Sequence, residues 1–240
     1  MPTLRRHVTR FVVLFPGRSG STYLISALDA QPHVSAKGEV LDPLRTDGPE
    51  AQLEWTRRFL RGPLLNPAKA VGFKTKLRDV LDQEGFAALL DELDVRMIYL
   101  DRRNDVKHAI SRITARRLKD STGRWNRYDG DERLEAFAVD VDDFQSRLDA
   151  VEAEKATISE YVGALERPLL HLDYEDLLSE PTGTFHRLLA YLGLPPAPLH
   201  ASTLKNTSDD LRDVVTNFAE LRARYAGTRY EPMFDEILVP

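Results

Sequence analysis

A short run of small and basic residues near the start of the chain has the chemistry of an anion-binding turn. Residues 15–24 read Phe-Pro-Gly-Arg-Ser-Gly-Ser-Thr-Tyr-Leu, and they join an apolar run at 11–15 to a helical pattern. Where a strand gives way to a helix, the first N–H groups of the helix lack intrahelical acceptors and the helix dipole favours negative charge. Ser21 and Thr22 add hydroxyl donors, and the planar guanidinium of Arg18 suits phosphate or sulfate oxygens. The segment predicts a phosphate-type site, and a capped turn without a ligand is the alternative.

A second candidate anion site follows the apolar run at 95–100. Arg103 comes directly after this run, and Ser111 lies eight residues further on, inside a helical pattern. An arginine at the end of a strand and a serine two turns into the next helix could converge on one anion. Because the carboxyl ends of parallel strands face one crevice, the two sites together predict a ligand with two separated phosphate groups. The basic segment 102–127 has nine Lys and Arg against two Asp, and a solvated helix face is the alternative interpretation.

The elements that must position these residues indicate a single-domain, three-layer α/β fold over residues 1–240. Four apolar runs have the length and continuous hydrophobicity of buried parallel strands. They lie at 11–15, 70–73, 95–100 and 168–172. Between and after them the apolar residues recur at helical spacing, which predicts βαβ units around a central parallel sheet. The expected helices include 53–59, 81–93, a long amphipathic helix over 144–165, and two later ones near 184–192 and 216–225.

The overall composition excludes several classes of protein. The 33 basic and 38 acidic residues give a net charge of −5, which argues against binding of nucleic-acid polymers through overall charge. The chain has no cysteine, so a disulfide framework, thiolate catalysis and cysteine-ligated zinc are ruled out. Its six histidines show no paired ligand spacing, which predicts no metal site. The apolar run at 11–15 is too short for a signal peptide or membrane span, so we expect a soluble, cytoplasmic protein; its oligomeric state cannot be read from the sequence.

The ordered set of motifs resembles that of the sulfotransferases that use 3′-phosphoadenosine-5′-phosphosulfate (PAPS). The set consists of residues 16–22, then Arg103 with Ser111, then residues 172–178, Leu-Asp-Tyr-Glu-Asp-Leu-Leu. Two further segments, Gly72-Phe73-Lys74 and the tail from 204 to 228, resemble the bacterial carbohydrate-type members. The resemblance covers most of the chain except about 113–165, which we expect to be a helical region on the acceptor side.

This resemblance implies roles for individual residues toward the cofactor PAPS and its product, adenosine 3′,5′-bisphosphate. The P-loop-like turn would hold the 5′-phosphosulfate through Gly17, Arg18, Ser19, Gly20, Ser21 and Thr22. Arg103 and Ser111 would bind the 3′-phosphate, and Lys205 is a weaker candidate for that role. Tyr23 and Tyr174 would flank or hydrogen-bond the adenine, unless they are half-buried core aromatics.

The resemblance also implies a catalytic set without a metal. By analogy with phosphoryl transfer, the protein mainly positions the reactants and neutralises charge, and Arg18 would stabilise the leaving 5′-phosphate. Glu39 lies where the carbohydrate-type members have a catalytic glutamate and is the predicted general base. His33 and His108 are the alternative bases, and Glu39 would then be an exposed loop carboxylate without a catalytic role. Lys74 ends an apolar run, so it would contact the sulfuryl group or the acceptor, or else be a solvated strand end.

The predicted reaction is in-line sulfuryl transfer from PAPS to a hydroxyl of a carbohydrate, glycolipid or other small metabolite. Trp125, with Arg124 and Tyr128, could form a wall for the acceptor. One alternative is a P-loop small-molecule kinase, because residues 95–101 form an apolar run ending in aspartate; Ser21, where Walker A needs lysine, counts against it. The other is a non-enzymatic nucleotide- or RNA-binding module, but its basic segment lacks interleaved aromatic residues.

Overall fold

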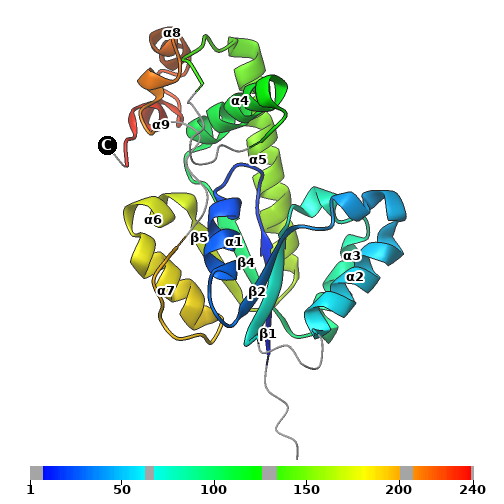
Figure 1. Ribbon diagram of the computed structural model, residues 1–240. Helices are drawn as coiled ribbons and strands as arrows, with labels where there is room; N and C mark the ends of the chain where they lie inside the picture. Colours follow the sequence, from blue (N-terminus) through cyan, green and yellow to red (C-terminus); the bar gives the residue numbers. More distant parts are fainter. Residues whose placement is uncertain (1–7, 63–67, 126–133, 201–207, 239–240) are drawn as a thin grey trace, which may run out of the picture.

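Five parallel strands form the central sheet of the computed structural model shown in Figure 1. The structure describes residues 8–62, 68–125, 134–200 and 208–238. In order across the sheet the strands are β2 (Val34–Glu39), β3 (Ala70–Thr75), β1 (Thr9–Leu14), β4 (Val95–Asp101) and β5 (Leu169–Asp173). Every neighbouring pair is parallel, so the carboxyl ends of all five strands lie along one edge of the sheet. The predicted α/β fold with a central parallel sheet is confirmed.

Helices cover both faces of this sheet, which explains why its central strands are continuous apolar runs. The helices α1 (Ser21–Asp29), α6 (Tyr174–Ser179) and α7 (Pro181–Tyr191) cover one face, and α2 (Pro49–Arg61), α3 (Gln83–Glu92) and α5 (Val141–Ala164) cover the other (Figure 1). Along β1, Phe11 and Val13 pack in the first core, while Val12 and Leu14 pack in the second. Since alternate side chains point to opposite faces, a strand buried on both sides must be apolar at every position.

A further group of helices lies beyond the carboxyl edge of the sheet, at the top of Figure 1. It contains α4 (Asp105–Thr122), the first turns of α5, the 3₁₀ helix η3 (Leu211–Asp213), α8 (Phe218–Arg224) and α9 (Glu231–Asp235). These elements share a third apolar core built around Phe144, Tyr225 and Phe234. The group stands over the strand ends and thereby makes one wall of the pocket described below.

The edge strand β2 was not predicted. Its sequence, Val-Ser-Ala-Lys-Gly-Glu, is polar because it pairs with β3 alone, and only Ala36 is buried. Pairing shifts register between Lys37 and Glu39, as at a β-bulge, which redirects the strand end. Glu39 therefore ends a strand instead of lying in a loop.

The remaining connections include two 3₁₀ turns on the same side as α2 and α3. They are η1 (Pro43–Asp47), after β2, and η2 (Leu77–Asp79), after β3. Within the described ranges, no helix combines the length and the apolarity needed to cross a membrane. The longest, α5, has 24 residues but carries acidic and basic side chains along its length.

Candidate active site

A pocket of about 670 Å³ opens at the carboxyl edge of the sheet. Its walls come from the β1–α1 turn, the ends of β2 and β3, the middle of α4, and parts of α5 and α6. Nine of the predicted site residues line it: Gly17, Arg18, Gly20, Ser21, Thr22, Tyr23, Glu39, Ser111 and Tyr174. Ser19 and Lys74 are buried directly beside these residues, whereas Lys205 lies outside the described part of the chain. Segments far apart in the sequence are thus brought to one cavity.

The β1–α1 turn has the backbone shape of an anion-binding site. Gly20 precedes α1 in the left-handed region at φ 80°, and the first helical hydrogen bond runs from Leu24 N–H to the Gly20 carbonyl at 3.1 Å. The N–H groups of residues 21–23 therefore have no acceptor within the helix. A Cβ on Gly20 would lie 2.4 Å from Cδ2 of Tyr174, so only glycine fits beneath that ring. Arg18 also has a positive φ, 77°, which is rare for a residue with a side chain and is found at ligand-binding turns.

Two side chains of α4 hold this turn through the carbonyl of Gly17. Nε2 of His108 is 2.7 Å from the Gly17 carbonyl, and Nε of Arg112 donates to the same oxygen at 3.3 Å. His108 is completely buried, and burial holds its pKa well below the ordinary value, so the ring is neutral and can donate its Nε2 proton. His108 does not line the pocket, and His33 is exposed at the amino end of β2. Neither position favours the alternative that a histidine is the base.

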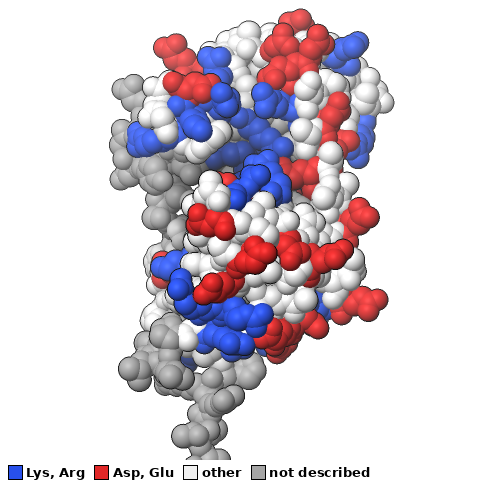
Figure 2. Space-filling view, turned by 90° about the vertical axis from the view of Figure 1, so that its right-hand side faces the viewer, with Lys and Arg blue, Asp and Glu red and all other residues white. Residues whose placement is uncertain are grey.

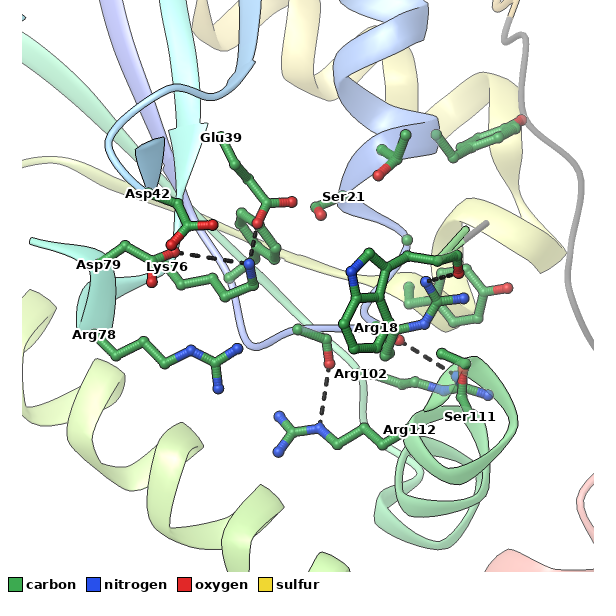
Figure 3. A pocket seen from close by; sticks show the side chains of 18 of the residues that line it. Arg18, Ser21, Glu39, Asp42, Lys76, Arg78, Asp79, Arg102, Ser111 and Arg112 are labelled. Carbon is green, nitrogen blue, oxygen red and sulfur yellow. Dashed lines mark hydrogen bonds and ion pairs between the residues drawn. The ribbon is translucent and has the colours of Figure 1, made fainter. Parts of the chain in front are cut away.

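A buried lysine connects the turn to Glu39. Nζ of Lys74 donates to Oγ of Ser21 at 3.1 Å and to Oγ1 of Thr22 at 2.8 Å, and it lies 3.1 Å from Oε1 of Glu39. The other carboxylate oxygen of Glu39 accepts a hydrogen bond from Lys76, and Figure 3 shows this pair beside Asp79. Burial raises the pKa of Glu39, but the charges of Lys74 and Lys76 outweigh it, so the pKa lies below the ordinary value. Glu39 is therefore an ionised carboxylate at neutral pH.

Lys76 is a site residue that sequence reasoning missed. A signal was present, because Lys76 comes two residues after Lys74 and side chains two apart along a strand share a face. The two ammonium groups hold the carboxylate of Glu39 from both of its oxygens. The interpretation of Lys74 as a solvated strand end does not fit, since its residue is only 3% exposed.

Arg18 reaches across the mouth of the pocket. Its Nη1 donates to the backbone oxygen of Trp125 at 3.1 Å, and Trp125 itself lines the pocket with its residue 46% exposed. Burial lowers the pKa of Arg18 to about 10, with a further lowering from the nearby charge of Arg102. The guanidinium still carries its charge at neutral pH. Of the proposed acceptor wall, Trp125 is in place, Arg124 is exposed beside it, and Tyr128 lies outside the described residues.

The predicted 3′-phosphate pair is only partly brought together. Ser111 lines the pocket, but Arg103 does not; its Nη1 donates to Asp173 at 2.8 Å and to Asp176 at 2.9 Å. Its neighbour Arg102 lines the pocket instead, and only 5% of that residue is exposed. The structure thus points the two consecutive arginines in different directions.

Arg102 was also missed by sequence reasoning. Its guanidinium lies over the ring of Tyr174 at 4.9 Å, and its Nη1 donates to the Arg18 carbonyl at 3.4 Å. Its buried Nε has no hydrogen-bond partner among the described residues, and neither has the buried Oγ of Ser19 in the turn. Buried donors without protein partners are rare in folded proteins, so these two groups are available to a bound water or ligand. A nucleotide with anionic groups near the turn fits these donors, the free helix start and the aromatic ring of Tyr174.

One cluster in the described chain has the composition of a metal site. Asp101, His171 and Asp173 offer ligand atoms within 4.8 Å of one another at the ends of β4 and β5. Basic groups already contact both carboxylates, since Lys155 lies 3.3 Å from Asp101 and Arg103 lies 2.8 Å from Asp173. None of these three residues lines the pocket. That the reaction needs no metal stays a prediction.

The chain is similar to known proteins over nearly its whole length, although no protein-family model matches it. Nodulation protein H of Rhizobium tropici is 28% identical over 253 residues, with 94% of this chain and 92% of the relative covered. Nodulation protein H of Rhizobium meliloti (strain 1021) is 26% identical over 252 residues, with 94% of each covered. Among solved structures, the sulfotransferase from Alicyclobacillus acidocaldarius gives a TM-score of 0.52 at 17% identity, covering 95% of this chain and 96% of that one. The chain therefore has the sulfotransferase fold, and the family resemblance that its motifs carry is confirmed.

Proposed function

We propose that the protein is a PAPS-dependent sulfotransferase that acts on a hydroxyl of a carbohydrate-type acceptor. The observation that carries this proposal is the line of contacts from the turn to the base. Ser21 and Thr22, Lys74, and then Glu39 are joined by consecutive polar contacts inside one pocket. A donor held at the turn and an acceptor held at Glu39 would therefore lie on either side of one buried ammonium group.

The donor side binds and neutralises negative charge. When bound, PAPS supplies the activated sulfuryl group. The N–H groups at the start of α1, together with Arg18 and the hydroxyls of Ser21 and Thr22, would hold the phosphosulfate end. Ser111 and Arg102 would bind the remaining phosphate, with Tyr174 against the adenine. Arg103 could bind the same phosphate only if it left its ion pairs with Asp173 and Asp176.

The acceptor side orients a hydroxyl group and removes its proton. Glu39 is ionised, so one of its oxygens can accept the proton as the hydroxyl oxygen bonds to sulfur. The bond between sulfur and the 5′-phosphate oxygen would break in the same step, and Arg18 would neutralise the charge of the departing phosphate. Lys74 and Lys76 keep the carboxylate in one orientation, which matters because proton transfer needs hydrogen-bond geometry. Trp125 at the pocket mouth is 46% exposed, and its ring, over which the ammonium group of Lys119 lies at 4.4 Å, offers aromatic surface to a sugar ring. The motif resemblance to bacterial carbohydrate-type members supports the same acceptor class.

Ligand-induced stabilisation tests the cofactor assignment without knowledge of the acceptor. We expect adenosine 3′,5′-bisphosphate to raise the melting temperature in the absence of magnesium, because a ligand that binds only the folded state stabilises it by RT ln(1 + [L]/Kd). At 100 times Kd this is about 2.7 kcal/mol. ATP with magnesium should have little effect. The opposite pattern would replace this proposal by the kinase alternative, and stabilisation by RNA oligomers alone would favour the binding-module alternative.

Transfer of label from radioactive PAPS to a panel of sugars and glycolipids then tests the reaction itself. The matched control is Glu39→Gln, which keeps the size of the side chain but cannot accept a proton. We expect product with the wild type and a rate lower by roughly 10²–10⁴ with the variant. A wild type that binds the bisphosphate but transfers label to none of the hydroxyl compounds would contradict the proposed activity.

A further inference from the structure

Three arginines from three separate elements line the acceptor side of the pocket. Arg78 comes from η2, Arg112 from α4 and Arg147 from α5. Figure 3 shows the guanidinium groups of Arg78 and Arg112 near each other in the part of the pocket below Lys76. Their charges act on one another, since Arg78 and Arg147 both contribute to the lowered pKa of Arg112, after the larger effect of burial.

The carboxylates of the described chain do not fully neutralise this cluster. Glu154 of α5 is shared, because Oε2 accepts a hydrogen bond from Arg112 while Oε1 lies 3.7 Å from Nη1 of Arg78. That second separation is longer than a hydrogen bond, and Oε1 of Glu154 accepts none within the described residues. Arg147 pairs with Asp143 one turn away on an exposed face, a type of contact that contributes little. The side chain of Arg78 is 61% exposed, and its ion pair with Glu154, at 3.7 Å, is with a carboxylate that Arg112 already holds by a hydrogen bond.

The nucleotide contacts proposed above do not include these three arginines. The proposed nucleotide contacts Arg102 and Ser111 lie to the right of Arg78 and Lys76 in Figure 3. The end of Arg78 lies beside Gly17 of the donor turn, at 3.9 Å from the position of a Cβ there, and next to the side chain of Lys76. Lys76 contacts Glu39, so Arg78 borders the place proposed for the acceptor hydroxyl, and Arg112 and Arg147 line the same pocket.

We propose that the acceptor is anionic, and that a carboxylate, phosphate or sulfate group on it binds to Arg78 and Arg112. Arg147 adds to the positive electrostatic potential at this place. This inference rests on the proposed function and adds the chemical class of the acceptor. Planar guanidinium groups bind such oxyanions through paired hydrogen bonds, and a partly enclosed site strengthens them. Figure 2 shows Lys and Arg side chains gathered where that face of the molecule is hollowed, which favours the approach of an anionic molecule.

Calorimetric titration of the protein saturated with adenosine 3′,5′-bisphosphate tests the acceptor class. The probes are glucose, glucuronate, glucose 6-phosphate and glucose 6-sulfate, which share one ring and differ in charge. We expect at least one anionic hexose to bind ten-fold or more tightly than glucose, and the ranking among the three identifies the preferred group. Failure of the bisphosphate itself to bind would contradict the proposed function, and it is seen before any hexose is added.

Variants connect that preference to the arginines. We expect Arg78→Gln and Arg147→Gln each to reduce the preference for the anionic hexose, the former by ten-fold or more, without changing bisphosphate affinity. Arg58→Gln is the matched control, because Arg58 is an exposed arginine of α2 that does not line the pocket. Equal binding of glucose and the anionic hexoses, no measurable binding of any anionic hexose, or a preference unchanged in both pocket variants would overturn the inference.

Discussion

Replacement of Arg102 by glutamine should weaken nucleotide binding far more than the same change at Arg103. Arg102 is 5% exposed, lines the pocket and lies over the ring of Tyr174 at 4.9 Å. The side chain of Arg103 is 52% exposed, and its hydrogen bonds run to Asp173 and Asp176. The two variants remove the same charge from adjacent positions, so they differ only in where the guanidinium points.

The size of the effect follows from the contact that is lost. A hydrogen bond to a charged group contributes about 1.5–3 kcal/mol, and every 1.4 kcal/mol is a factor of ten in affinity. Arg102→Gln should therefore raise the Kd of adenosine 3′,5′-bisphosphate by roughly 10- to 100-fold. Arg103→Gln breaks exposed ion pairs worth about 0–1 kcal/mol to the fold and should change that Kd by less than about five-fold.

Calorimetry with adenosine 3′,5′-bisphosphate, 5′-AMP and 3′-AMP measures both the loss and its location. If Arg102 binds the 3′-phosphate, Arg102→Gln weakens the bisphosphate and 3′-AMP but leaves 5′-AMP nearly unchanged. The melting temperature without ligand controls for damage to the fold, and Arg102→Lys keeps the charge without the planar fork. A large loss in Arg103→Gln combined with normal affinity in Arg102→Gln would refute this reasoning, because it would require Arg103 to leave its carboxylates on binding.

Four further results are expected. Glu39→Gln should lower kcat by roughly 10²–10⁴ with the bisphosphate Kd unchanged; a kcat near that of the wild type would exclude Glu39 as the base. In the folded protein the pKa of Glu39 lies below its ordinary value of 4.5, so the pairing of Glu39 with the lysines stabilises the fold above pH 4.5 and is lost as the pH falls further. Loss of activity through protonation of Glu39 should therefore begin only below about pH 4.5. A rate that already falls near pH 6 would point to another base. Gly20→Ala should destabilise the fold by about 1–2 kcal/mol from its positive φ alone, and more from the clash with Tyr174. Gly163→Ala in α5, where a Cβ meets nothing within 4 Å, should be neutral or stabilising in the same denaturation assay.

The central sheet could be predicted because each central strand is buried on both faces. Burial on two sides removes the polar alternation of a strand and leaves a continuous apolar run, which is easily recognised in β1, β3 and β4. The edge strand β2 has one neighbour and a polar sequence, so nothing in residues 34–39 separates it from a loop. The catalytic candidate Glu39 could therefore be named from the motif, while the strand that positions it could not.

The local turn could also be predicted, but contacts between distant elements could not. The turn residues are consecutive in the sequence, and the first N–H groups of any helix that follows a strand are free to bind an anion. The choice between Arg102 and Arg103 depends on Tyr174, about 70 positions later, and on two aspartates that attract Arg103 away from the pocket. The approach of Arg78 to Arg112 likewise depends on how η2 and α4 pack, which no local pattern records.

The double contact of Lys74 gives the proposed reaction an electrostatic coupling. One buried ammonium group contacts both Glu39, the proposed base, and the hydroxyls of Ser21 and Thr22 in the turn proposed to hold the donor. Burial lowers the pKa of Lys74, and the negative charge of Glu39 partly offsets that lowering, so the two charges depend on each other. When Glu39 accepts the proton of the acceptor hydroxyl, it loses its charge, and the ammonium group is left without its carboxylate partner. At that moment negative charge builds up on the oxygens held at the turn, and the same ammonium group is available to stabilise it. A lysine in this position thus connects proton removal on one side of the pocket with charge neutralisation on the other.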